Sequence, residues 1–262
     1  MERIPTTYGL SDARKEYRHR RQHPYMHSDV LDLAAVLNTL KKTHVQTLWT
    51  IAELGGRARL KDLQKKIKAS KSTLSSRLAA LADKGLVTYE AGFAELVYKT
   101  PLCYLANIEN IPYAYVGLLG KPLPVEHREP ETETAISLLR EEGITIDKIL
   151  VATTKDAIEE WTPIMSPELR AMLDFAILDI REMNSIEAVM DRMTRRILDL
   201  TRRYITILDC TSGTRPAGIA YYAIADKLKT PLIYVYADEK RIYWLKNRRT
   251  LITELNLQHI KS

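Results

Sequence analysis

The sequence predicts an α/β protein with two folded parts: three helices and a β-hairpin, followed by a mostly parallel sheet covered by helices. Three observations support this. The chain has 262 residues, a length typical of two domains. Apolar residues recur at helical spacing over residues 43–86. Strand-like and helical segments alternate from Ile111 onward, as in sheets built from parallel strands.

Composition excludes several classes of protein. With 45% hydrophobic residues the chain is typical of proteins that bury a core, which excludes disorder and collagen-like repeats. Two cysteines, with no CxxC motif and no Cys/His cluster, exclude a disulfide scaffold and a structural zinc site. The apolar runs fall far short of the roughly 18 residues that a membrane span needs. We expect a soluble, cytoplasmic protein with no metal and no cofactor, and the low content of Gln and Asn favours a thermophilic or archaeal source.

Positive charge is concentrated in the first part of the chain. Residues 1–100 carry 18 Lys and Arg against 10 Asp and Glu, whereas the other 162 residues carry 21 against 23. Lys and Arg supply most non-specific affinity for nucleic acids by neutralising phosphates. The asymmetry indicates either a part that binds a polyanion or a solvated basic face.

Residues 1–42 are expected to form a basic arm and one helix. The arm, ARKEYRHRRQH, contains Arg20 and Arg21 and either follows a DNA backbone or is a solvated tail. Three histidines recur every four residues from His19, but Pro24 interrupts the helix that would align them as metal ligands. Ser28 is expected to cap the helix, whose apolar residues are Val30, Leu33, Val36, Leu37 and Leu40.

Residues 43–105 are expected to form a second domain that begins with three short helices. Their apolar positions are Val45, Leu48, Trp49 and Ala52, then Leu60, Leu63 and Ile67, then Leu74, Leu78 and Leu81. Gly55-Gly56 separates the first two helices. Ser70 or Ser72 caps the third by accepting from a free backbone N–H, and Gly85 ends it in a left-handed conformation.

A β-hairpin is predicted directly after the third helix. Leu86 to Tyr89 and Ala94 to Lys99 are strand-like and flank a turn. The stretch from Leu60 to Glu90, LKDLQKKIKASKSTLSSRLAALADKGLVTYE, resembles the DNA-binding core of bacterial and archaeal winged helix-turn-helix regulators. The resemblance implies that the hairpin is the wing and that the third helix enters a major groove of double-stranded DNA. A protein-interaction module is the alternative.

The third helix has a polar side suited to DNA, because its leucines all lie on the other side. Lys71 and Arg77 are the expected contacts to phosphates or base edges. The full set of candidate DNA-binding residues is Lys71, Ser72, Ser75, Ser76 and Arg77, together with Arg20 and Arg21 of the arm.

Residues 106–262 are expected to form a Rossmann-like α/β domain with helices on both faces of the sheet. The predicted strands are Tyr113–Leu119, Ile149–Thr153, Ala176–Arg181, Tyr204–Asp209 and Leu232–Tyr236, with an antiparallel edge strand at Ile242–Leu245. The predicted helices are Thr132–Glu142, Lys155–Trp161, Pro167–Leu173, Asn184–Arg202 and Pro216–Leu228. The carboxylates of Glu129, Glu131 and Glu133 are expected to stabilise the first of these helices by interacting with the positive end of its dipole.

The most informative segment is the turn after the strand that ends at Asp209. Backbone N–H groups of such a turn face outward at the carboxyl edge of a sheet, where phosphate or ribose binds. Gly213 permits close approach of the backbone, and Arg215 offers a cation for an anionic ligand. Hydroxyl groups are available from Thr211, Ser212 and Thr214.

The string Asp209-Cys210-Thr211-Ser212-Gly213-Thr214-Arg215-Pro216 resembles the "Asp-x-Thr-Gly-Gly-Thr-Lys-Pro" signature of the CARF domain, the CRISPR-associated Rossmann fold. Ser212 and Arg215 depart from it, and the winged helix comes first here, the reverse of the better-known CARF regulators. Over residues 111–246 the resemblance implies a pocket for a cyclic oligoadenylate, lined by the signature and by the loop after the first strand. The implied ligand-binding residues are Leu118, Gly120, Lys121, Asp209, Thr211, Ser212, Gly213, Thr214 and Arg215.

No catalytic residue is assigned, because the sequence holds no GxGxxG, GxxxxGK[ST], GxSxG or HExxH motif. The prediction is a CRISPR-associated, antiviral-defence transcriptional regulator that binds DNA and senses a cyclic oligoadenylate. Paired half-sites on the DNA and a ring-shaped ligand with two-fold symmetry both favour a homodimer. One alternative is a ring nuclease that slowly cleaves its ligand with Lys121, Thr211, Thr214 and Arg215. The other is a regulator that senses a different phosphorylated metabolite.

Overall fold

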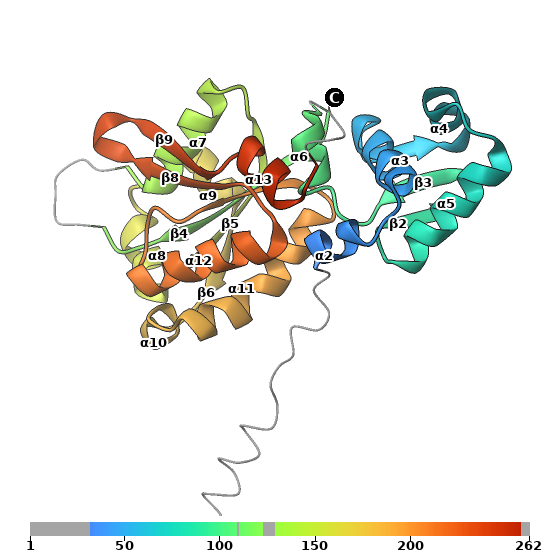
Figure 1. Ribbon diagram of the computed structural model, residues 1–262. Coiled ribbons are helices and arrows are strands. Elements are labelled where there is room, and N and C mark those ends of the chain that lie inside the picture. Colours follow the sequence, from blue (N-terminus) through green and yellow to red (C-terminus); the bar gives the residue numbers. More distant parts are fainter. Residues whose placement is uncertain (1–31, 109, 123–128, 258–262) are drawn as a thin grey trace, which may run out of the picture. The chain divides into compact units, whose positions relative to one another are not determined.

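The computed structural model describes residues 32–108, 110–122 and 129–257 (Figure 1). Arg20, Arg21, the three histidines and Ser28 lie outside the described residues. The first described helix is α2 (Leu33–Asn38), and its N-cap is Asp32, whose Oδ1 accepts from the Ala35 N–H at 3.0 Å. The described cap of this helix is thus Asp32, where the sequence analysis expected Ser28.

The predicted winged helix-turn-helix is confirmed. Its helices are α3 (Lys42–Glu53), α4 (Leu60–Ile67) and α5 (Lys71–Asp83). Its strands β1 (Arg57–Arg59), β2 (Val87–Glu90) and β3 (Phe93–Leu96) form an antiparallel sheet in the order β1-β3-β2. The predicted leucines make its core, and Leu63, Leu74, Leu78 and Leu81 are completely buried.

The ends of α5 follow from two residues identified in the sequence. Ser70 is the N-cap, and its Oγ accepts from the Thr73 N–H at 3.2 Å. Gly85 lies just beyond the helix with a φ of 68°, the left-handed conformation that favours glycine after a helix. Between α4 and α5 the chain turns at Lys68, the C-cap of α4, which also adopts a positive φ. These two ends fix the length of the helix that the sequence predicts to read DNA.

The remaining part is a mostly parallel, Rossmann-like sheet of six strands in the order β6-β5-β4-β7-β8-β9, with only β9 antiparallel. The strands are β4 (Tyr113–Leu119), β5 (Ile146–Thr153), β6 (Leu173–Ile177), β7 (Ile205–Asp209), β8 (Leu232–Tyr236) and β9 (Arg241–Lys246). The helices are α6 (Leu102–Ala106), α7 (Glu131–Glu141), α8 (Lys155–Trp161), α9 (Pro167–Met172), α10 (Ile180–Met183), α11 (Ile186–Thr201), α12 (Arg215–Leu228) and α13 (Arg248–Glu254), with a 3₁₀ turn at Ala237–Glu239.

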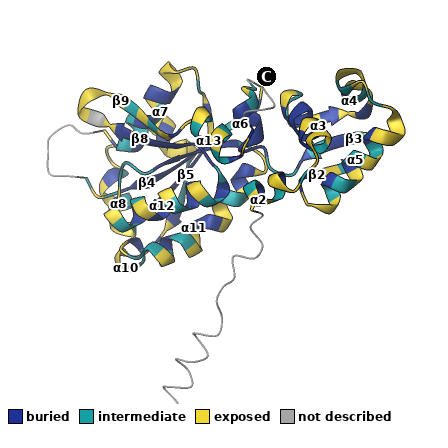
Figure 2. Ribbon diagram, in the orientation of Figure 1, coloured by how far each residue is buried: buried dark blue, intermediate teal, exposed yellow. Residues whose placement is uncertain are grey.

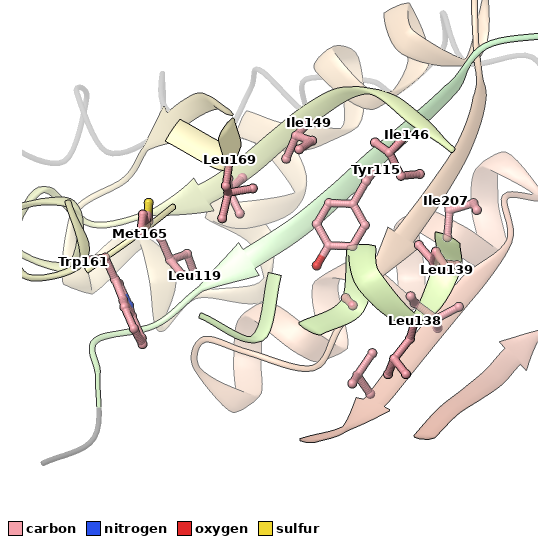
Figure 3. Packing of buried hydrophobic residues seen from close by; sticks show 14 of the residues in the cluster. Tyr115, Leu119, Leu138, Leu139, Ile146, Ile149, Trp161, Met165, Leu169 and Ile207 are labelled. Atoms are coloured by element: carbon pink, nitrogen blue, oxygen red, sulfur yellow. The ribbon is translucent and has the colours of Figure 1, made fainter. Parts of the chain in front are cut away.

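The core of this domain lies on both faces of the sheet. On one face α7, α8 and α9 pack on the strands through residues that include Leu139, Trp161, Leu169 and Tyr115 (Figure 3). On the other face α11 and α12 pack against each other and on β7. Central strands β4, β5 and β7 are buried almost throughout, and Figure 2 shows β4 and β5 in dark blue. Strands buried on both faces are expected where crossover helices cover a parallel sheet.

One predicted strand is misplaced. The sequence indicates a strand at Ala176–Arg181, whereas β6 is Leu173–Ile177 and the following residues form α10. The cause is a capping box: the Asp179 side chain accepts from the Glu182 N–H at 2.7 Å, and the Glu182 carboxylate accepts from the Asp179 N–H at 2.9 Å. This reciprocal pair begins a helix where the apolar run alone suggested a strand.

The segment after the wing is bound to the α/β domain by backbone and side-chain hydrogen bonds. The Lys99 N–H donates to the Thr201 carbonyl at 2.7 Å. The Thr100 hydroxyl donates to the Tyr204 carbonyl at 2.9 Å and accepts from the Thr206 N–H at 2.8 Å. Thr100 thereby anchors this segment to the first residues of β7.

Candidate functional site

The candidate ligand site lies where the order of the strands reverses. From β4 the chain passes to β5 and β6 on one side, and then returns to place β7 on the other side. Ligands of open α/β sheets bind at such a switch point, outside the carboxyl ends of the strands. Here those ends are Leu119 of β4 and Asp209 of β7, which the two loops of the predicted site follow.

A hollow of about 380 Å³ opens at this edge. Of the predicted residues it is lined by Gly120, Lys121, Thr211, Ser212, Gly213 and Thr214. It is also lined by Leu119, which lies in the loop expected to line the pocket, and by Glu131, Thr154, Ile180 and Met183, which sequence reasoning missed. Most of these come from the starts of α7 and α8 and from α10, elements that the signature motif does not include.

The two loops contact each other through a hydrogen bond and two glycines. The Gly120 N–H donates to Ser212 Oγ at 3.0 Å. A Cβ at Gly120 would lie 3.3 Å from the Gly213 nitrogen, and a Cβ at Gly213 would lie 3.1 Å from Leu118 Cβ. Leu118 is buried behind Gly213 instead of lining the hollow. Glycine at both positions therefore lets the two backbones approach and form one surface.

Asp209 is buried beneath the turn and stabilises it by accepting hydrogen bonds. Its Oδ1 accepts from the Thr211 N–H at 2.8 Å and from the Thr211 hydroxyl, and its Oδ2 accepts from the Tyr115 hydroxyl at 2.6 Å. Burial raises the pKa of the Asp209 carboxyl, and this effect exceeds that of the hydrogen bonds from Thr211 and Tyr115, which lower the same pKa. Burial, and then Asp209 itself, raises the pKa of Tyr115 well above its usual range, so Tyr115 stays a donor.

The two threonines of the signature have structural partners. Thr211 Oγ1 also accepts from the Val235 N–H at 2.7 Å, which joins the turn to β8. Thr214 is the N-cap of α12, accepting from the Ala217 N–H at 3.3 Å, and its hydroxyl donates to the Met183 carbonyl at the end of α10. Both hydroxyl hydrogens are thus donated within the protein, and they shape the turn. Arg215 is exposed and lies outside the lining of the hollow.

Among the described residues, the charged groups around the hollow are mainly acidic. Lys121 Nζ lies 3.1 Å from an Asp156 carboxylate oxygen and 3.2 Å from one of Glu160. These hydrogen bonds, with Asp156 first, raise the pKa of Lys121 above its ordinary value. On the other side, Ser212 Oγ donates to Glu131 Oε2 at 3.4 Å. The one lysine that lines the hollow is therefore already paired with two carboxylates.

The candidate DNA-binding surface is the polar side of α5. Lys71, Ser72 and Ser76 are exposed, and Ser75 and Arg77 are partly exposed, on the side away from the buried leucines. Sequence reasoning missed two cations in β1, where the Arg57 and Arg59 guanidinium groups lie 4.7 and 5.7 Å from the Phe93 ring centre. The run of basic residues in α4 was visible in the sequence and could have predicted a basic DNA-binding surface that extends beyond α5.

Within residues 32–108, 110–122 and 129–257, no group of three or more His, Cys, Asp or Glu is placed to hold a metal ion. Over the same ranges no helix is long and apolar enough to cross a membrane.

Residues 40–91 match the model of the MarR family, so the chain carries a winged helix-turn-helix of MarR type. This match spans α3 to β2 and includes every candidate DNA-binding residue of α5. No curated protein sequence is similar enough to this chain to count as a match.

Three solved structures are similar to part of the chain. Can2 from Sulfobacillus thermosulfidooxidans, in complex with cyclic tetra-adenylate, is 18% identical over 55% of this chain and 38% of its own, with a TM-score of 0.39. Csm6 from Enterococcus italicus, bound to cyclic hexa-2'-fluoro-hexa-dAMP, is 12% identical over 58% and 40%, with a TM-score of 0.39. Protein VC1899 from Vibrio cholerae is 11% identical over 51% and 33%, with a TM-score of 0.38. This chain therefore spans two fifths or less of the length of each.

Proposed function

We propose that this protein is a homodimeric transcriptional regulator of CRISPR-associated defence that binds double-stranded DNA and senses a cyclic oligoadenylate. The observation that carries the proposal is the hollow at the switch point of the sheet. It combines the CARF-like signature turn with the loop after β4 in a chain that also contains a MarR-type DNA-binding domain.

The hollow offers backbone and hydroxyl groups more than cations. Gly213 brings the backbone to the surface of the turn, and Ser212 contributes a hydroxyl that already joins the two loops. Backbone N–H groups at the surface of such a turn suit the phosphate and ribose oxygens of a nucleotide, and a ligand would compete with Glu131 for the hydrogen of the Ser212 hydroxyl. Glu131, at the edge, is an acceptor suited to a ribose hydroxyl or an adenine amino group. This mixture favours a nucleotide over a simple phosphate or sulfate ion.

A second copy of the chain would complete the ligand site. A ring of four or six nucleotides is larger than the hollow of one chain, and a two-fold ring suits two equivalent hollows. Exposed apolar side chains on α12 and on the β8–β9 edge offer a surface for this dimer, namely Ile219, Tyr222, Tyr234, Tyr236, Tyr243 and Leu245. Tyr234 and Tyr243 are cross-strand partners, and Lys246 Nζ lies 5.6 Å from the Tyr222 ring centre, which links the edge to α12.

Calorimetric titration with cyclic tetra-adenylate and cyclic hexa-adenylate tests the proposal. We expect one of the two rings to bind with a stoichiometry of one ring per two chains, and to be recovered intact. Recovery of cleaved, linear product would favour the ring nuclease instead. Binding of neither ring, together with binding of mononucleotides or sugar phosphates, would favour a sensor of another metabolite.

Removing two cations of α5 is expected to weaken DNA binding. A Lys71→Ala, Arg77→Ala variant should bind duplex DNA more weakly. The magnitude of the slope of log affinity against log salt concentration should fall by about 1–2, because a variant that makes fewer phosphate contacts releases fewer counterions on binding. Lys155→Ala, which removes an exposed lysine of the α/β domain, is the control and should leave both unchanged. An unchanged salt slope in the double variant would exclude α5 as the helix that contacts phosphates.

Neutralising the two partners of Lys121 is expected to tighten ligand binding. In an Asp156→Asn, Glu160→Gln variant the Lys121 ammonium is released from its carboxylates and can turn to an anionic ligand, so affinity for the ring should rise several-fold at low salt. Glu159→Gln is the matched control, since Glu159 pairs with Lys155 and does not contact Lys121. Weaker binding in the double variant would mean that the two carboxylates orient Lys121 toward the ligand.

A further inference from the structure

A second and larger cavity, of about 740 Å³, lies at the opposite edge of the same sheet. Its walls include Tyr113, the first residue of β4, and Gly143-Ile144, the turn just before β5. These residues are at the amino ends of parallel strands, whereas the hollow of the signature turn is at their carboxyl ends. The two cavities have no lining residue in common among the described residues.

Aromatic side chains make one wall of this second cavity. The rings of Tyr104 in α6 and Trp244 in β9 are stacked with centres 6.2 Å apart and planes at 24°. The Trp244 Nε1–H donates to Glu142 Oε2 at 3.0 Å, which fixes the orientation of the indole. Tyr104 is buried, but Trp244 and Tyr113 are partly exposed, so each presents part of a ring to the cavity. Fixed, partly exposed rings are the usual platform for a planar ligand.

Two arginines make the adjacent wall. Arg248 donates from Nε to the Tyr104 carbonyl at 3.1 Å and from Nη2 to Asn107 Oδ1 at 2.7 Å, and its guanidinium lies 5.1 Å from the Tyr104 ring centre. Arg249 lines the cavity and is exposed. Among the described residues no ion pair to a carboxylate engages either arginine, and Glu142 already accepts from Trp244. Two arginines against Glu142, the one carboxylate of the described lining, leave the cavity with a net positive charge that suits an anion.

We propose that this cavity is a second ligand site, which takes a small planar anion of the nucleoside monophosphate class. The base would lie against Trp244 and Tyr113, and the phosphate against Arg249 and Arg248. The volume is within the range of about 300–1,000 Å³ that is common for small-molecule sites. This inference does not rest on the proposed regulator function, because none of its residues belongs to the signature turn or to α5.

The test is a titration of the full-length protein with 5′-AMP, followed by calorimetry and by tryptophan fluorescence. Binding should quench fluorescence, and Trp244→Phe should remove the quenching, since the other tryptophans, Trp49 and Trp161, do not line the cavity. Adenosine and inorganic phosphate should each bind at least tenfold more weakly than 5′-AMP. Binding of phosphate as tight as that of 5′-AMP would overturn the role of the aromatic wall.

Two variants separate this site from the rest of the molecule. Arg249→Ala should weaken 5′-AMP binding about tenfold without a change in folding, because the Arg249 side chain is exposed. Arg241→Ala is the matched control, since Arg241 lies on the same strand as Trp244, contacts Tyr243 and does not line the cavity. Gly213→Val should leave 5′-AMP binding unchanged. Absence of 5′-AMP binding at millimolar concentration, or its loss in Gly213→Val instead of Arg249→Ala, would overturn the proposal.

Discussion

Replacing Gly213 by valine is expected to reduce the affinity for cyclic oligoadenylate by a factor of 100 or more, while DNA binding is retained. Gly213 has a φ of 80°, and a Cβ there would lie 3.1 Å from Leu118 Cβ, which is buried. The valine side chain would press on Leu118 behind the turn and force the backbone of the turn to move, which changes the surface that the turn presents to the hollow. The positive φ adds about 1–3 kcal/mol of strain in the folded state. Calorimetry with the preferred ring and a DNA-binding assay on the same preparation measure both effects.

Gly55→Val is the matched control for this variant. Gly55 has a φ of 86°, so valine meets the same backbone strain, but a Cβ there has no atom within 4 Å and lies in the winged-helix part of the chain. We expect Gly55→Val to lower the stability by a similar amount and to bind the ring like the unchanged protein. Equal ring affinity in Gly213→Val and in the unchanged protein would show that the ligand does not contact the signature turn.

The helices of the winged domain could be predicted from the sequence because their determinants are local. The apolar period of α5 and its cap at Ser70 lie within one stretch of chain, and Gly85 ends it. The strand β1 could not be predicted in the same way. It has three residues and exists because Arg57 to Arg59 pair with Phe93 to Glu95, far along the chain. Strands this short carry too little pattern to be distinguished from a loop.

The candidate ligand site could likewise be predicted from the sequence only in part. The signature turn was identified from its residues, and six of the nine predicted ligand-binding residues line the hollow. What the sequence could not indicate is the direction of the hydroxyl groups of Thr211 and Thr214. Their partners, the Val235 N–H and the Met183 carbonyl, come from other elements of the fold. The position of Glu131 follows likewise from the packing of α7, although its place in the first turn of a helix was expected.

Thr100→Val is expected to destabilise the protein by roughly 1–3 kcal/mol, because it leaves the buried Thr206 N–H and the partly buried Tyr204 carbonyl without this partner. The Thr100 side chain is almost completely buried, and its hydroxyl donates to the Tyr204 carbonyl and accepts from the Thr206 N–H. Valine has the same shape but offers neither bond, so packing is preserved and only the hydrogen bonds are lost. Urea unfolding followed by circular dichroism measures the change, and Thr100→Ser should recover most of the stability.

Thr206→Val provides a control at the residue whose backbone N–H donates to Thr100. Thr206 is completely buried, and its hydroxyl is among the described buried groups that have no hydrogen-bond partner. Replacing this hydroxyl by a methyl group removes an unpaired polar group from the interior, so stability should stay within about 1 kcal/mol of the original value or rise. The two variants make the same chemical change in neighbouring buried threonines and are expected to differ in effect. Equal destabilisation by both would mean that loss of the Thr100 hydrogen bonds is not what weakens the fold.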